Sequence, residues 1–106
     1  MQQMPFDGIT FKDTFFIQRG RESEELLHFH ELVHVVQWAR LGVDKFLLAY
    51  GLGLLQFGYE QSPLEAMAYE LQNGFASGTL PNNLVELIEQ ATDGVWSQAA
   101  QFVQAP

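Results

Sequence analysis

The feature that most constrains the fold is one long amphipathic helix in the first half of the sequence. Apolar residues recur there at the three- and four-residue spacing of one helix face: Leu26, Phe29, Val33 and Val36. Ser23 is expected to cap the N-terminus of this helix, and Gly42 is a natural C-terminal stop. A helix of this kind needs partners that cover its apolar face.

The middle of this helix carries the segment His30-Glu31-Leu32-Val33-His34. Residues four apart lie about 40° apart around a helix axis and about 6 Å apart along it, so both imidazoles can reach one small cation. Glu31 is offset from His30 by about 100°, which places its carboxylate beside the metal, where it can take a proton from a metal-bound water. His28 is offset by about 200° and is expected to face away.

A catalytic zinc ion takes three protein ligands and keeps one open position. No histidine follows His34, so the third ligand is expected to be a carboxylate or to come from another chain. The downstream candidates on or next to the third expected helix are Glu60, Glu65 and Glu70. We favour Glu65, because the small residues after it permit a close approach to the histidine helix.

A purely structural role for Glu65 is the alternative. Ser62-Pro63-Leu64-Glu65 has the spacing of a capping box, in which the Glu65 carboxylate bonds back to the backbone N–H of Ser62. Glu60 and Glu70 are expected to be solvated or to support a ligand indirectly.

The remaining pattern predicts a helix-dominated α+β fold in a single domain, residues 1–106. Residues 9–11 and 14–17 are β-prone and are separated by Lys12-Asp13, which favours a hairpin. Phe15 and Phe16 cannot both face the core of that hairpin. Further helices are expected over 44–57, from Ser62 to Gly74, and as two short helices between Leu84 and Val103.

Composition excludes several classes of function. The 106 residues contain no cysteine, which excludes disulfides, thiolate metal sites and cysteine nucleophiles. The formal charge of −8 argues against nucleic acid and against an anionic membrane as partners. The start shows no secretory signal, and the apolar run Phe46–Phe57 is shorter than the about 20 residues that span a bilayer. A soluble, cytoplasmic protein is expected.

These residues resemble the gluzincins, zinc peptidases with His-Glu-x-x-His on one helix and a glutamate on a later helix. The later element of that group commonly reads Glu-x-x-Ala followed by Asp; Glu65-Ala66-Met67-Ala68 matches it, and Tyr69 replaces the Asp. In the family the Asp supports a histidine ligand, so Tyr69, Gln72 or a backbone carbonyl would take that role here.

The likeness is closer to the minimal members, the mini-zincins and similar bacterial domains. Residues 26–37 are similar to their Leu-Leu-x-x-His-Glu-Leu-x-His-Val-x-Gln core, and residues 59–66 are similar to their downstream segment. The resemblance covers about residues 8–72 and implies a minimal zincin-like fold: an N-terminal hairpin packed on the histidine helix, with three to four further helices. It implies zinc as the cofactor and a peptide or protein as the substrate.

The expected reaction is hydrolysis of a peptide bond. His30, His34 and Glu65 would hold zinc, and Glu31 would act as general base toward the attacking water. Tyr59 is the first candidate to donate a hydrogen bond to the oxyanion, with Tyr50 and Tyr69 in reserve. A free edge of the strand over residues 14–17 would bind the substrate backbone.

Two other readings stay open. In the first, the chain is a zinc-binding regulatory or adaptor module without turnover. In the second, it is a helical interaction domain in which the His-Glu-x-x-His motif is accidental. The sequence gives neither the oligomeric state nor the substrate specificity.

Overall fold

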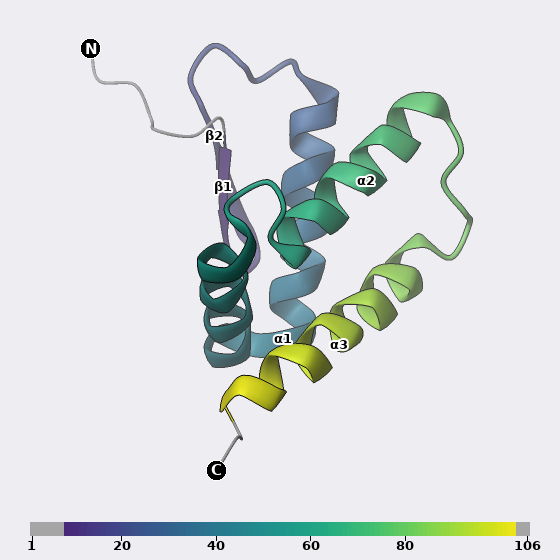
Figure 1. Cartoon of the computed structure of the whole chain (residues 1–106). Coiled ribbons are helices and arrows are strands. Elements are labelled where there is room, and N and C mark those ends of the chain that lie inside the picture. The colour runs from purple at the N-terminus through teal and green to yellow at the C-terminus, as the bar shows by residue number, and fades with distance from the viewer. Residues whose placement is uncertain (1–7, 104–106) are drawn as a thin grey trace.

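A β-hairpin followed by three helices makes up the computed structural model, which describes residues 8–103 (Figure 1). The helices dominate, and the hairpin packs against the first of them, so the expected helix-dominated α+β architecture is confirmed. Residues 1–7, where the sequence shows no secretory signal, lie outside the described residues. Within residues 8–103, none of the helices combines the length and the apolar character that a membrane crossing requires.

The hairpin consists of β1 (Gly8–Phe11) and β2 (Thr14–Ile17), which pair antiparallel. Lys12 in the turn adopts a left-handed conformation with φ of 59°. Neighbouring strand residues face opposite sides, as expected: Phe15 turns inward to meet the ring of His28, whereas Phe16 is 58% exposed.

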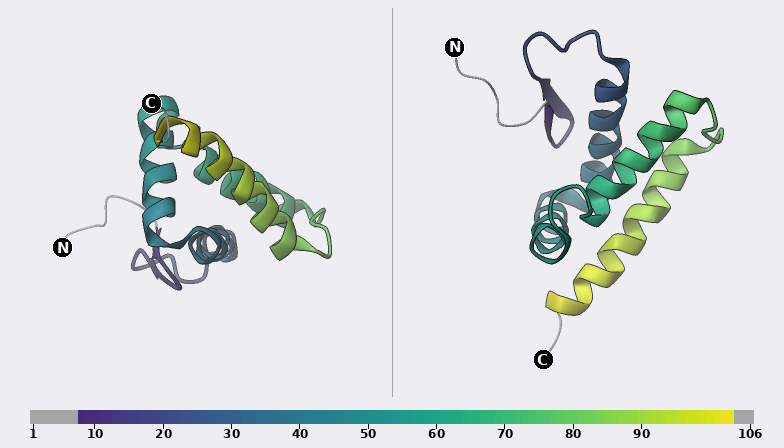
Figure 2. Two further views of the ribbon diagram at one scale, coloured as in Figure 1. Left: turned by 90° about the horizontal axis from the view of Figure 1, so that it is seen from below. Right: turned by 45° about the horizontal axis from the view of Figure 1, so that its top comes forward.

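Helix α1 (Glu25–Phe57) is broken at Gly42, where φ is 80° and ψ is 170°. A non-helical residue at this point lets the chain change direction, and Figure 2 shows the two halves running in clearly different directions. Gly42 is therefore the end of the histidine helix, as predicted. The second half, residues 43–57, turns back toward the start of α2.

The start of α1 differs from the prediction that Ser23 caps it. The helix begins at Glu25, with Glu24 in the cap position, and no side chain makes a cap hydrogen bond. The Glu24 carboxylate is instead held by the Arg21 guanidinium, whose Nε and Nη2 atoms each lie 2.7 Å from a carboxylate oxygen. An ion pair with Arg21 thus takes the place of a capping contact.

Helix α2 (Pro63–Ser77) begins at the proline that the sequence indicates and ends three residues later than expected. Its C-terminal cap is Gly78, which is left-handed with φ of 71°. The earlier glycine, Gly74, lies inside the helix, and a Cβ atom there would come 2.8 Å from a methyl group of Leu80. Gly74 therefore serves the close approach of the following loop rather than helix termination.

Helix α3 (Leu84–Val103) is one continuous helix, not the two short helices expected. Its buried residues are Ile88, Thr92, Ala99 and Ala100, and the first three of them follow one helical spacing of four and seven residues. Because one stripe faces the core throughout, packing against α1 overrides the cost of Gly94 in the helix interior. Figures 1 and 2 show α2 and α3 side by side, and both contact α1.

Two small apolar clusters form the core. Trp38, Phe46 and Leu64 are at the centre of the larger cluster, near the break in α1. Val33, Ala68 and Ile88 form the smaller one. The candidate site adjoins both clusters in the sequence, because Val33 of the smaller cluster comes directly before His34 and Leu64 of the larger one directly before Glu65.

Candidate metal centre

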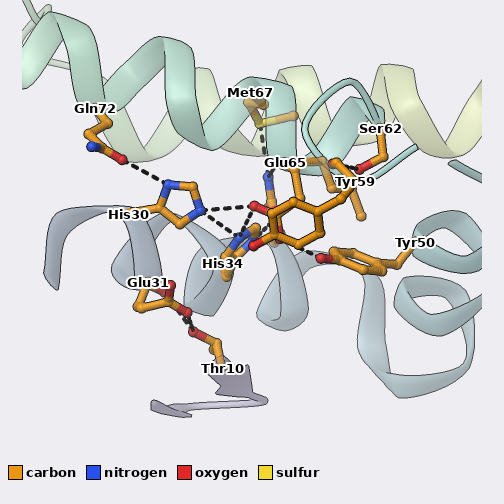
Figure 3. A network of polar contacts seen from close by, with 12 residues as sticks. Thr10, His30, Glu31, His34, Tyr50, Tyr59, Ser62, Glu65, Met67 and Gln72 are labelled. Atoms are coloured by element: carbon orange, nitrogen blue, oxygen red, sulfur yellow. Dashed lines mark hydrogen bonds and ion pairs between the residues drawn. The ribbon is translucent and has the colours of Figure 1, made fainter. Parts of the chain in front are cut away.

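Three potential metal ligands converge where α1 crosses α2 (Figure 3). The Nε2 atoms of His30 and His34 lie 3.3 Å apart. Oε1 of Glu65 lies 2.9 Å from the first nitrogen and 3.1 Å from the second. All three side chains are buried, and within residues 8–103 they are the one group of His and acidic side chains whose ligand atoms converge in this way.

Two glutamines fix how the imidazoles are oriented. Nδ1–H of His34 donates to Oε1 of Gln37 at 2.7 Å, and Nδ1–H of His30 donates to Oε1 of Gln72 at 2.9 Å. The Gln37 amide is itself oriented, because its Nε2 donates to the carbonyl of Leu64 at 3.1 Å. In the neutral form, each imidazole therefore carries its lone pair on Nε2, directed at Glu65.

Three acceptor atoms that face one another in a buried space repel unless a cation lies among them. A proton can supply that charge when no metal is bound. Burial alone would lower the pKa of His34, but its contacts with Glu65 outweigh burial and raise the pKa. Burial would raise the pKa of the Glu65 carboxyl, yet the hydrogen bonds with His30 and His34 hold that pKa well below its ordinary range.

The capping role considered for Glu65 is not observed. Ser62 makes no side-chain cap bond; its hydroxyl donates instead to the carbonyl of Tyr59 at 2.8 Å. Both carboxylate oxygens of Glu65 point toward α1: Oε1 faces the histidines, and Oε2 accepts a hydrogen bond from the hydroxyl of Tyr50. The first turn of α2 therefore presents this carboxylate to the cluster.

Glu31 lies beside the cluster and faces the hairpin. Its Oε1 accepts a hydrogen bond of 2.7 Å from the hydroxyl of Thr10, which also lies 3.2 Å from the Glu31 carbonyl. The other oxygen, Oε2, lies next to Gly8, where an added Cβ would approach to 3.2 Å. A glycine at this position leaves room beside Oε2. Thr10 anchors the other carboxylate oxygen, and the side chain, although only 4% exposed, lines two cavities.

The three tyrosines take different places. Tyr50 contacts Glu65, so it supports a ligand rather than standing free as an oxyanion donor. The ring of Tyr69 packs edge-on against the ring of His30, with centroids 4.5 Å apart. Tyr59 is 48% exposed and its ring lies in front of Glu65 in Figure 3. Burial and the nearby charge of Glu65 raise the pKa of Tyr59, so its hydroxyl keeps its proton at neutral pH.

The other residues singled out in the sequence lie apart from the ligand atoms. His28 is turned toward the loop before α1, where its Nε2 lies 2.6 Å from the carbonyl of Glu22. Glu60 and Glu70 are exposed. Gln72, one of three supports considered for a histidine, is the one that contacts His30.

Sequence reasoning gave no role to Gln37 and Thr10. Gln37 is fully buried, and its position three residues after His34 places it on the same helix face, which is the signal that would have indicated it. Thr10 is a buried hydroxyl on a strand of otherwise apolar residues. Its contact with Glu31 spans 21 residues and has no local pattern.

Two cavities adjoin the cluster and meet at Glu31 and Tyr59, which line both. The narrow cavity has a volume of about 210 Å³ and reaches His34 and Glu65. The wide cavity has a volume of about 590 Å³ and reaches His30. A molecule bound across this junction would contact the candidate ligands and Glu31 together.

No protein-family model matches the chain, and no curated protein or solved structure matches it. The function is therefore inferred from the geometry of the site.

Proposed function

We propose that this chain is a zinc-dependent peptidase whose metal is held by His30, His34 and Glu65. The observation that carries the proposal is the convergence of two Nε2 lone pairs and one carboxylate oxygen within 3.3 Å of one another. Two imidazoles and one carboxylate form a donor set that suits zinc and leaves a fourth position for water or substrate.

The surroundings of these ligands fit a metal better than an accidental pairing. Each imidazole donates its second nitrogen proton to an amide oxygen, the kind of support that orients metal-bound histidines. Tyr50 donates to the carboxylate oxygen that does not face the histidines. An accidental pair of surface histidines would gain nothing from a fully buried glutamine such as Gln37, which here orients His34.

Glu31 is the proposed general base. Its Oε1 is held by Thr10, which fixes the carboxylate, and its Oε2 lies next to Gly8, where no side chain covers it. Oε2 would accept the proton of the attacking water and return it to the leaving amine. A bound zinc ion lowers the pKa of water to about 7 and polarises a carbonyl group.

Tyr59 remains the proposed oxyanion donor. It lines both cavities next to Glu31, and its raised pKa keeps the hydroxyl protonated, as a hydrogen-bond donor requires. Tyr50 lines only the narrow cavity and Tyr69 only the wide one, whereas Tyr59 lines both and shares a side-chain hydrogen bond with Tyr69.

The strand expected to bind substrate is revised. Residues 14–17 line neither cavity, whereas Gly8–Thr10 of β1 line the narrow one. Alternate residues on an edge strand turn their backbone N–H and C=O groups away from the paired strand. We therefore assign the pairing of an extended substrate to β1.

Zinc binding is tested first. We expect about one zinc ion per chain after gel filtration in zinc-containing buffer, and loss of that ion in His34→Ala and Glu65→Gln. His28→Ala is the matched control, because it removes a histidine of the same helix that lies outside the cluster. If the unmodified chain binds no zinc and a chelator leaves its melting temperature unchanged, the motif is accidental.

Turnover is tested second, with a quenched fluorescent peptide library and the zinc-loaded chain. Glu31→Gln keeps the Thr10 contact and removes the base, so we expect normal zinc content and at least about 100-fold slower cleavage.

A zinc-binding module without turnover is the second candidate. It is favoured by one observation, the hydrogen bond from Thr10 that occupies one oxygen of Glu31 in the free chain. If zinc binds and neither the unmodified chain nor Glu31→Gln cleaves any library member, this second function replaces the first.

A further inference from the structure

The narrow cavity has mainly apolar walls, although it opens onto a polar cluster. Its apolar lining comes from β1 and from both halves of α1: Ile9, Trp38, Phe46, Leu47 and Tyr50. The only ionisable carboxylates that line it are Glu31 and Glu65, which already belong to the proposed site. The cavity therefore offers no charged group to an occupant beyond the metal centre.

The aromatic walls of the narrow cavity are held in place by stacking. The rings of Trp38 and Phe46 are stacked with centroids 3.9 Å apart, and the ring of Phe46 is stacked on Tyr50 at 5.5 Å. Trp38 and Phe46 are both buried, so their rotamers are fixed by the core. Because Tyr50 also contacts Glu65, the wall and the metal centre share one side chain.

The mouth of this cavity exposes apolar surface to water in the free chain. Ile9 is 43% exposed and Leu47 is 55% exposed, and both line the cavity. Apolar surface that is removed from water on binding favours the bound state in proportion to its area. An apolar occupant gains from this site, whereas a charged occupant would lose hydration without a partner.

The volume limits the occupant to one side chain. A cavity of about 150 Å³ with apolar walls holds a benzene molecule. A cavity of about 210 Å³ therefore accommodates a phenyl or isobutyl group with its methylene, but not a second residue.

The wide cavity differs in size and in polarity. Besides His30 and Glu31, it is lined by Arg21, Glu24 and Glu60, so it offers hydrogen-bonding and charged groups. A polar, extended chain fits these walls better than an apolar group does. The two cavities meet at Glu31, so one molecule can fill both.

We propose that the substrate is a peptide that places one large apolar side chain, phenylalanine or leucine, in the narrow cavity, with its polar backbone continuing into the wide cavity. This inference rests on the proposed peptidase function for the nature of the ligand. It adds the side chain that is selected and the residues that select it. Leu47 is the specificity residue at the mouth, and Trp38 and Phe46 form the wall.

The test uses blocked pentapeptides, acetyl-Gly-Gly-X-Gly-Gly-amide, with X as Phe, Leu, Ala or Lys. Affinity is measured by calorimetry on the zinc-loaded Glu31→Gln chain, so that binding is followed without hydrolysis. Cleavage of the same peptides by the unmodified zinc-loaded chain is followed by mass spectrometry. We expect Phe and Leu peptides to bind about 10- to 100-fold more tightly than the Ala peptide.

A matched pair of variants locates the preference. Leu47 and Leu48 are neighbouring, exposed leucines of α1, and only Leu47 lines the narrow cavity. We expect Leu47→Asp to weaken binding of the Phe peptide at least tenfold, and Leu48→Asp to change it less than twofold. Leu47→Ala, which adds no charge, should weaken the Phe peptide more than the Ala peptide.

The outcomes separate the two proposals. Selective binding that depends on Leu47 supports the narrow cavity as a side-chain site, whether or not the peptides are cleaved. If the unmodified chain binds the peptides selectively but cleaves none of them, the proposed peptidase function is contradicted and the side-chain site is not. Cleavage that is indifferent to X supports the peptidase and overturns the assignment of the cavity. Equal loss in Leu47→Asp and Leu48→Asp, or no binding of any peptide, also overturns it.

Discussion

Replacing Gln37 with leucine tests how much the hydrogen bond that orients His34 contributes to the candidate metal centre, while the three candidate ligands stay in place. Gln37 is fully buried; it accepts from Nδ1–H of His34 at 2.7 Å and donates to the carbonyl of Leu64 at 3.1 Å. Leucine has a similar size, and Gln37→Leu removes both of these hydrogen bonds and a third, from Nε2 to Sδ of Met67 at 3.2 Å. Gln72→Leu is the natural comparison, because Gln72 makes the corresponding contact to His30 from a position that is only partly buried.

The burial of these two glutamines sets the expected magnitudes. Leaving the buried Nδ1–H of His34 without an acceptor costs about 1–3 kcal/mol, and the lost bond to Leu64 costs about 1 kcal/mol more. Gln37→Leu should therefore lower the free energy of unfolding by about 2–4 kcal/mol. Water can replace the amide of Gln72, so Gln72→Leu should cost about 0.5–1.5 kcal/mol.

Urea unfolding in the presence of a chelator measures these free energies without any contribution from metal. Zinc affinity is measured separately by competition with a chromophoric chelator, and each variant should lose about 10- to 100-fold, because each loses the contact that orients one imidazole. Equal destabilisation by the two variants would refute the burial argument. Unchanged zinc affinity in both would refute the role of the amides in orienting the ligands.

Three further predictions concern pH, packing and catalysis. In chelator, the free energy of unfolding should fall as pH rises above about 6.5, because the folded state raises the pKa of His34. It should also fall as pH drops below about 4.5, because the folded state lowers the pKa of Glu65. Melting curves from pH 3.5 to 8.5 test both signs. Gly53→Ala should destabilise the chain by about 1–3 kcal/mol, because its Cβ would come 2.9 Å from the proline that begins α2, whereas Gly51→Ala, with open space around it, should stabilise it by about 0.5–1 kcal/mol in urea unfolding. Tyr59→Phe should lower kcat by about 100-fold with zinc content unchanged, as steady-state assays and metal analysis would show.

The elements of the fold that the sequence predicts are those set by local chemistry. The break at Gly42 and the start at Pro63 each follow from one residue with a strong backbone preference, and the hairpin follows from two β-prone runs with a two-residue separation. Except at Ser23, where the local Arg21–Glu24 ion pair replaces the expected cap, the errors arise where tertiary contacts decide. The sequence suggests that Gly74 ends a helix, but Gly74 lies inside α2 and its missing side chain leaves room for Leu80 of the following loop. The residues from Leu84 form one helix because one side of it packs on α1 along its length.

In the candidate site, too, local spacing is predictable from the sequence and contacts between helices are not. The positions of His30, Glu31 and His34 depend only on helical spacing, so the sequence suffices to bring the two imidazoles together. The choice of Glu65 as their partner could not be separated from capping by sequence alone, since Ser62 and Glu65 have the right spacing for either role. Only the crossing of α1 and α2 decides it, because that crossing turns the carboxylate toward the histidines.

The placement of this polar cluster connects the site to the stability of the whole domain. Among residues 8–103, nine apolar and eight polar side chains are buried, and the polar cluster includes direct sequence neighbours of both apolar groups, Val33 before His34 and Leu64 before Glu65. A small domain has little apolar burial to offset a buried charge. The histidine–carboxylate contacts therefore depend on a cation, and a metal that binds only the folded chain contributes its binding free energy to folding. Under the proposed function, the candidate metal centre would be a structural element of the core as well as a reaction site, so zinc content and melting temperature should change together in every variant of its ligands.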